Sequence, residues 1–159
     1  MPAPLRLAVV GAGLIGQEHA QRIQEHQDLD LAYVVDPYLD PADSPFAGQT
    51  QLVPDLGEVL AHVDGVILAT PNHVHAEGAL ACISAGIPVL VEKPVADTPE
   101  SAERIVAAAE SSGVPVLVGH HRRHSPLLDK AREAIAAGTI GRPVAVMGSA
   151  LFYKPDDYF

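Results

Sequence analysis

Residues 7–16 read LAVVGAGLIG, a short apolar run followed by three glycines in the pattern G-x-G-x-x-G. The apolar run is typical of a buried strand, and residues 14–27 favour a helix. A second apolar stretch, residues 31–35, ends on Asp36, twenty residues after Gly16. The order of strand, glycine loop, helix, strand and acid is typical of dinucleotide binding. The alternative is a glycine-rich turn that binds nothing.

Each glycine has an expected role in such a loop. Gly11 permits a tight turn, Gly13 lets the backbone approach a pyrophosphate, and Gly16 lets the helix pack close to the strand. The start of the helix offers unpaired N–H groups and the positive end of its dipole to the phosphates. Asp36 is placed to accept hydrogen bonds from an adenosine ribose. A solvated turn acid before Pro37 is the alternative for this position.

The charge distribution bears on the partners of the chain. The net charge is −10, and residues 23–92 contain eleven acids but no Lys or Arg. Nucleic acid would require a basic stripe, so nucleic-acid binding is not expected. A 2′-phosphate on the ribose would face Asp36, with Asp40 and Asp43 close behind and no base to pair with it. NAD is therefore favoured over NADP.

The composition is that of an ordinary soluble domain. The chain has 159 residues, of which 48% are hydrophobic and 19% charged. No apolar run approaches the roughly 18 residues of a membrane span, and the start lacks the apolar segment of a signal peptide. Cys82 is the only cysteine, which excludes an intrachain disulfide and suits a small buried core residue. We expect a cytoplasmic location and no membrane partner.

Strand and helix patterns alternate along the chain. This alternation predicts an α/β fold, a Rossmann-type doubly wound parallel sheet in three αβα layers. The expected strands are 5–10, 31–35, 66–69, 89–91 and 116–118. The expected helices are 14–27, 55–62, 74–85, 99–111 and 126–138, and residues 37–50 are expected to form a loop. Residues 144–153 predict a further strand, which would have to join the sheet edge, pair with another chain or remain loose.

Polar side chains gather where three of these strands end, in segments 70–75, 92–94 and 120–124. Lys93 could bind a substrate hydroxyl and ease its deprotonation, or it could be a surface lysine that ends a strand. The histidines of these segments suit a polar pocket or helix caps. A metal site is the alternative, although no Cys or carboxylate stands at a familiar ligand spacing from them. Arg122 and Arg123 could hold a hydroxylated or anionic substrate, or they could be solvated.

Taken in order, these motifs resemble the glucose–fructose oxidoreductase / inositol dehydrogenase / rhizopine-catabolism (Gfo/Idh/MocA) family. The resemblance covers nearly the whole chain. It rests on the glycine loop, Asp36, the segment Ala69-Thr70-Pro71-Asn72 with His75, the segment Glu92-Lys93-Pro94, residues 119–126 and the pair Gly138 and Gly141. It implies an NAD- or NADP-dependent enzyme that oxidises or reduces a hydroxyl of a sugar, cyclitol or related polyol.

The resemblance also implies roles for individual residues. Lys93 is implied to contact both the substrate hydroxyl and the nicotinamide, and His121 and Arg123 to face the nicotinamide or the substrate. The residues implied to line the nicotinamide half of the cofactor site are Thr70, Pro71, Asn72, His75 and Glu92. Together with the glycine loop, the expected cofactor-binding residues are Gly11, Gly13, Leu14, Ile15, Gly16, Asp36, Thr70, Pro71, Asn72, His75, Glu92 and Lys93. No metal ligand is implied.

The chain departs from the family pattern in two places. His120 and His121 stand where the family often has an aromatic residue and an Asn, which leaves the substrate open. The family's proton-transfer pair, D-x-x-x-H, occurs nowhere in the 159 residues. We therefore expect residues 1–124 to form the NAD-binding Rossmann domain. Residues 125–159 would be a linking helix and the first strand of an α+β substrate and oligomerisation domain, largely absent from this chain.

Three hypotheses follow. The first is the cofactor domain of an NAD-dependent sugar or polyol dehydrogenase, in which this chain alone binds NAD without appreciable turnover and homo-oligomers are possible. The second is a non-catalytic NAD-binding module or sensor that pairs with another subunit. The third is a metal-dependent hydrolase that uses the histidines.

Overall fold

The structure is a computed structural model that describes residues 3–40, 44–46, 48–149, 151 and 153. The chain divides into two compact units, Met1–His120 and His121–Phe159. The first unit contains a parallel sheet, and the second contains a 3₁₀ turn and a helix. None of the helices in the described part of the chain is long and apolar enough to cross a membrane.

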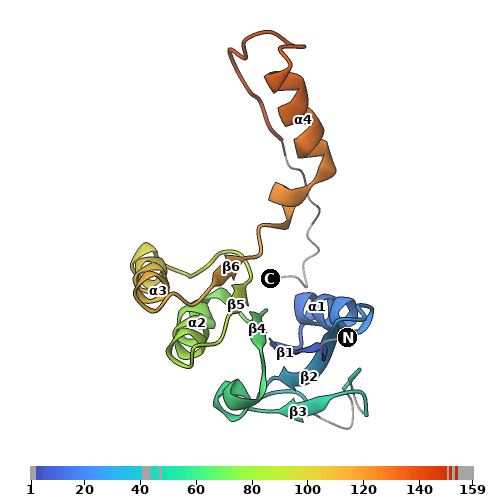
Figure 1. Cartoon of the computed structure of the whole chain (residues 1–159), viewed down its shortest axis with the longest axis vertical. Coiled ribbons are helices and arrows are strands. Elements are labelled where there is room, and N and C mark those ends of the chain that lie inside the picture. Colours follow the sequence, from blue (N-terminus) through green and yellow to red (C-terminus); the bar gives the residue numbers. More distant parts are fainter. Residues whose placement is uncertain (1–2, 41–43, 47, 150, 152, 154–159) are drawn as a thin grey trace. The chain divides into compact units, whose positions relative to one another are not determined.

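The first unit is built on one six-stranded sheet (Figure 1). Its strands are β1 (Leu5–Val10), β2 (Leu29–Val35), β3 (Gln51–Val53), β4 (Gly65–Leu68), β5 (Val89–Val91) and β6 (Val116–Val118). All neighbouring pairs are parallel, in the order β3-β2-β1-β4-β5-β6. The order reverses between β1 and β4, and ligands of doubly wound sheets bind in the crevice at such a switch point, beyond the carboxyl ends of the strands.

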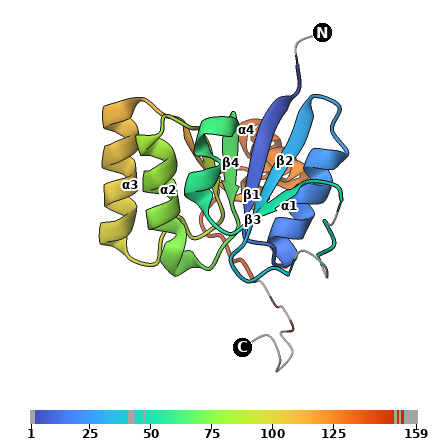
Figure 2. The ribbon, with the colours of Figure 1, turned by 90° about the horizontal axis from the view of Figure 1, so that it is seen from below.

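Helices cover both faces of this sheet. They are α1 (Leu14–Gln24), α2 (His75–Ser84) and α3 (Pro99–Ser112). Ala20 and Ile23 of α1 pack with Val9 and Val34 in one buried cluster, whereas α2 and α3 contribute to a second cluster. Figures 1 and 2 show α1 on one side of the strands and the neighbouring pair α2 and α3 on the other. The predicted Rossmann fold with three αβα layers is confirmed.

Local sequence signals account for the best-predicted helix. The Thr98 hydroxyl oxygen accepts a hydrogen bond from the backbone N–H of Ser101 at 3.2 Å, and Pro99 occupies the first turn. The helix ends at Gly113, whose φ of +72° is the left-handed conformation that closes helices. Capping and termination therefore fix both ends of α3, close to the predicted bounds.

Between β2 and β4, one strand was not predicted and one predicted helix is wrong in detail. No element was expected over residues 51–53, which form the edge strand β3 beside β2. Three half-exposed residues are too few to show a strand pattern, and the pairing with β2 decides the conformation. The single helix expected over 55–62 is two 3₁₀ turns, η1 (Leu56–Glu58) and η2 (Leu60–His62).

The second unit contains η4 (His121–His124) and α4 (Pro126–Ala136). Pro126 opens α4 as predicted, but the Ser125 side chain makes no capping hydrogen bond. The predicted strand 144–153 is not found among the described residues of that segment, 144–149, 151 and 153. Val144, Val146 and Met147 are all more than 85% exposed. An apolar run forms a strand only against a partner strand, and the described residues contain none for it.

Candidate functional site

The glycine loop, residues 11–16, connects β1 to α1 at the carboxyl edge of the sheet. Gly11 has a φ of +96°, and a Cβ built on it would lie 2.7 Å from the backbone oxygen of Ala69, just beyond β4. Gly16 lies in the first turn of α1, where a Cβ would overlap the backbone oxygen of Gly11. Gly11 and Gly16 thus have the predicted turn and close-packing roles.

Gly13 differs from the other two glycines, because a Cβ on it would meet nothing within 4 Å. It is the N-cap residue of α1, and it has no side chain that could cap the helix. Leu14 and Ile15 follow, and these residues are 85% and 53% exposed. Open space beside uncapped backbone N–H groups at a helix start fits a phosphate group.

Asp36 lies directly after β2 and binds the glycine loop. Its Oδ2 accepts a hydrogen bond from the backbone N–H of Ala12 at 2.8 Å, and its Oδ1 accepts one from Tyr38 at 2.9 Å. The sequence predicted a ribose acceptor or a solvated turn acid, and neither included this contact with the loop. A carboxylate accepts about four hydrogen bonds, so two protein donors leave room for ligand hydroxyls.

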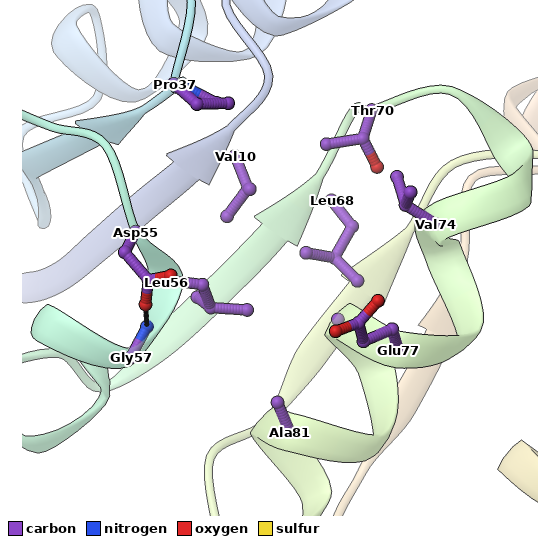
Figure 3. Close-up of a pocket in the computed structure, with 11 residues that line it drawn as sticks. Val10, Pro37, Asp55, Leu56, Gly57, Leu68, Thr70, Val74, Glu77 and Ala81 are labelled. Atoms are coloured by element: carbon purple, nitrogen blue, oxygen red, sulfur yellow. Dashed lines mark hydrogen bonds between the residues drawn. The ribbon is translucent and has the colours of Figure 1, made fainter.

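A pocket of about 460 Å³ opens at the ends of β1 and β4, on the face of the sheet that α2 covers (Figure 3). Val10 and Leu68 lie at the ends of β1 and β4, and Leu56 of η1 and Glu77 of α2 point toward one another across Leu68. The other lining residues are Pro37, Asp55, Gly57, Thr70, Val74, Gly78 and Ala81. Only Thr70 of this lining is predicted from the sequence as a site residue, because the pocket depends on the unpredicted approach of η1 to α2.

His75, which is expected to line the cofactor site, lies in the interior of the first unit. It is 1% exposed. Its Nδ1 lies 2.8 Å from the backbone oxygen of Pro94, and its Nε2 lies 2.8 Å from that of Thr70. The ring therefore joins the loops that follow β4 and β5. The Lys93–Pro94 peptide bond in the second of these loops is cis.

The remaining predicted residues of the first unit lie around these two loops. Pro71 and Asn72 are exposed at the start of η3 (Asn72–Val74), and Lys93 is exposed just beyond β5. Glu92 is partly buried, and its Oε1 lies 3.0 Å from Nε2 of His19 in α1. His19 was not named in the sequence analysis, and only its position three residues after Gly16 could have drawn attention to it.

His121 and Arg123 belong to the second compact unit. Both are exposed in η4. Within the described ranges, no three His, Cys, Asp or Glu side chains are grouped as metal ligands.

The family of this chain follows from its similarity to known proteins. The model of the oxidoreductase family with an NAD-binding Rossmann fold, Gfo/Idh/MocA, matches residues 5–120. The chain belongs to the Gfo/Idh/MocA family. The predicted family and the NAD-binding Rossmann domain are confirmed.

Individual Gfo/Idh/MocA proteins match most of this chain. Inositol 2-dehydrogenase 4 of Saccharopolyspora erythraea is 39% identical over 146 residues, which cover 88% of this chain and 43% of that protein. The WlbA dehydrogenase of Bordetella pertussis, solved in complex with NADH and UDP-GlcNAcA, has a TM-score of 0.76 and 29% identity, covering 89% of this chain and 42% of that one. GenD2 from gentamicin A biosynthesis, solved in complex with NAD, has a TM-score of 0.78 and 33% identity, covering 87% of this chain and 41% of that one. The chain thus spans less than half the length of these family members.

Proposed function

We propose that this chain is the cofactor-binding part of an NAD-dependent dehydrogenase that acts on a hydroxyl of a sugar, cyclitol or related polyol. The inositol dehydrogenase relative supports the substrate class. The observation that carries the cofactor choice is the Asp36 carboxylate, hydrogen-bonded to the glycine loop in a stretch, residues 23–92, without Lys or Arg. A 2′-phosphate would meet an uncompensated negative charge there.

The residues of the first unit suggest where each part of NAD would bind. The pyrophosphate would lie at Gly13 and the start of α1, and the adenosine ribose beside Asp36. The pocket lined by Val10, Leu56 and Leu68 would hold the adenine, because its lining is largely apolar, as adenine pockets require. The nicotinamide half would then reach the ends of β4 and β5, near Thr70, Pro71, Asn72, His75, Glu92 and Lys93.

Bound NAD would supply the hydride acceptor, and the chain would supply binding and orientation. Lys93 would hold the substrate hydroxyl through its Nζ ammonium and favour loss of the hydroxyl proton. His121 and Arg123 would contact the nicotinamide or the substrate. Residues 1–124 would form the NAD-binding domain and residues 125–159 the start of a substrate and oligomerisation domain. We propose a cytoplasmic location and possible homo-oligomers.

A non-catalytic NAD-binding module is the second candidate. It is favoured by the completeness of the first unit, in which all six strands and both buried clusters lie within residues 5–120. A domain with its own core can bind a ligand without the residues that turn a substrate over.

Titration with NADH and, in parallel, NADPH tests the proposed cofactor. The chain contains no Trp, so its own emission interferes little with nicotinamide fluorescence. Saturable binding of NADH, at least about tenfold tighter than that of NADPH, is expected. Equal affinities, or no binding of either, would contradict it. A panel of sugars and cyclitols tested for NADH formation separates the two candidates, because only a dehydrogenase reduces NAD. We expect negligible turnover by this chain alone and turnover by a chain with the full length of the relatives.

A further inference from the structure

The Glu92 carboxylate is held in place from three directions. Nε2 of His19 lies 3.0 Å from its Oε1, and the backbone N–H of Lys93 donates to its Oε2 at 3.2 Å. On the third side is Gly119, where an added Cβ would lie 2.7 Å from Oε1 and 2.8 Å from Cδ. The carboxylate therefore occupies a slot that exists because Gly119 has no side chain.

The contact between His19 and Glu92 joins distant parts of the first unit. The two residues are 73 positions apart. His19 lies in α1, the helix that begins at the glycine loop, and Glu92 follows β5 directly before Lys93. Their side chains are 22% and 17% exposed, so bulk water screens the contact only in part. The hydrogen bond fixes the carboxylate relative to the phosphate-binding helix.

Asp36 and Glu92 are carboxylates at the carboxyl ends of β2 and β5, strands on opposite sides of β1 and its glycine loop. Each accepts two hydrogen bonds from the protein and keeps acceptor capacity for a ligand. A dinucleotide has a ribose on either side of its pyrophosphate. If the adenosine ribose lies beside Asp36, the second ribose falls on the side of Glu92.

We propose that His19 is a positioning residue that orients Glu92 to accept hydrogen bonds from the hydroxyls of the nicotinamide ribose. This role rests on the proposed binding of NAD. Without His19 the carboxylate can turn toward water, and the ribose loses a pre-oriented acceptor. The adenosine and pyrophosphate contacts lie elsewhere and are unaffected. Loss of His19 should therefore weaken ligands that contain the second ribose and spare those that lack it.

The experiment compares three ligands by calorimetric titration of the intact chain. ADP lacks the second ribose, ADP-ribose contains it, and NADH adds the nicotinamide. His19→Leu removes the donor, and His19→Gln retains one, since the Gln amide nitrogen can take the place of Nε2. Gln21→Leu is the matched control, because it places the same side chain at an exposed position of α1.

His19→Leu should raise the Kd of both NADH and ADP-ribose about tenfold, the effect of losing a hydrogen bond to a charged group, and change that of ADP less than about twofold. His19→Gln should restore most of the affinity, and Gln21→Leu should bind all three ligands like the wild type.

Four results would overturn the role of His19. These are unchanged NADH affinity in His19→Leu, an equal loss for ADP and NADH, a loss for NADH without one for ADP-ribose, or no rescue by His19→Gln. Wild-type chain that binds none of the three ligands would overturn the proposed function itself, and the role of His19 with it.

Discussion

The two sides of the carboxyl edge of the sheet are held together in different ways. Beside β2, the Asp36 carboxylate accepts hydrogen bonds from two backbone N–H groups, those of Ala12 and Tyr38. Beyond β4 and β5, the contacts are made by histidine rings, with His75 between two backbone carbonyls and His19 on the Glu92 carboxylate. The β2 side depends on a short motif of special backbone conformation. The β4–β5 side depends on two histidine rings, one of which, that of His19, lies 73 positions from its partner Glu92.

The largest loss of stability is expected from a substitution in the glycine loop. Gly11→Ala forces a Cβ against the Ala69 backbone and places a side chain at a φ of +96°. We expect a loss of about 3 kcal/mol in the free energy of unfolding, since neither the strain nor the overlap can be relieved by a rotamer change. Urea denaturation measures this loss.

Gly13→Ala is the matched control for the glycine loop. It adds the same methyl group where nothing lies within 4 Å, so stability should fall by less than about 1 kcal/mol. NADH affinity should nevertheless fall at least about tenfold, because the methyl occupies the space proposed for the pyrophosphate. A large loss of stability in Gly13→Ala, or none in Gly11→Ala, would show that the two glycines are misassigned.

On the β4–β5 side, His75→Leu should lower the free energy of unfolding by about 2 kcal/mol. The carbonyls of Thr70 and Pro94 would lose a buried partner while apolar volume is retained. His75→Gln, which can still donate to one of the two carbonyls, should lose about half as much. Denaturation of both variants by urea provides the comparison, and equal stability of His75→Leu and the wild type would show that the bridge contributes nothing.

The smallest expected effect is the contribution of Cys82 to the pH dependence of the free energy of unfolding. Burial in α2 raises the pKa of this thiol from 9.0 to about 12. Above pH 9 the unfolded chain releases the thiol proton while the folded chain keeps it. The contribution of Cys82 to stability is therefore fully present below pH 9 and is lost as the pH rises toward 12. Between pH 8 and pH 10 the loss should be about 1 kcal/mol.

Cys82→Ala tests this contribution, because it removes the thiol and should flatten that part of the pH profile of stability. The same burial should make the native thiol react with a thiol reagent at pH 8 only as fast as the chain opens. Rapid labelling of the folded wild type, or an unchanged pH profile in Cys82→Ala, would contradict the burial of Cys82.

The contrast between the two sides also explains what the sequence could predict. The glycine loop and Asp36 were found because their spacing is local and each glycine has a conformational reason. The pocket lined by Leu56 and Glu77 was missed because it requires η1 and α2 to face one another, and no local sequence pattern predicts that approach. His19 was missed because its partner lies 73 positions away. His75 was predicted as a site residue of the segment 70–75. Its position in the interior follows from tertiary packing, which no local sequence pattern predicts.

The expected strand over 144–153 fails for a related reason. Its apolar residues fit a strand, but a strand is stable only when paired, and the described residues of this segment pair with none. Composition alone predicts that such residues favour burial, but it does not predict which surface buries them.

The most direct test of the central claim is the ratio of NADH to NADPH affinity in Asp36→Asn and in the wild type. Asp30→Asn removes the same charge from the opposite end of β2 and serves as the control. The wild type and Asp30→Asn should prefer NADH at least about tenfold. In Asp36→Asn, NADH should weaken about tenfold because the ribose and the Ala12 N–H lose a charged acceptor, and the preference should shrink to near unity. An unchanged ratio in Asp36→Asn would contradict the assignment of Asp36 as the residue that selects NAD.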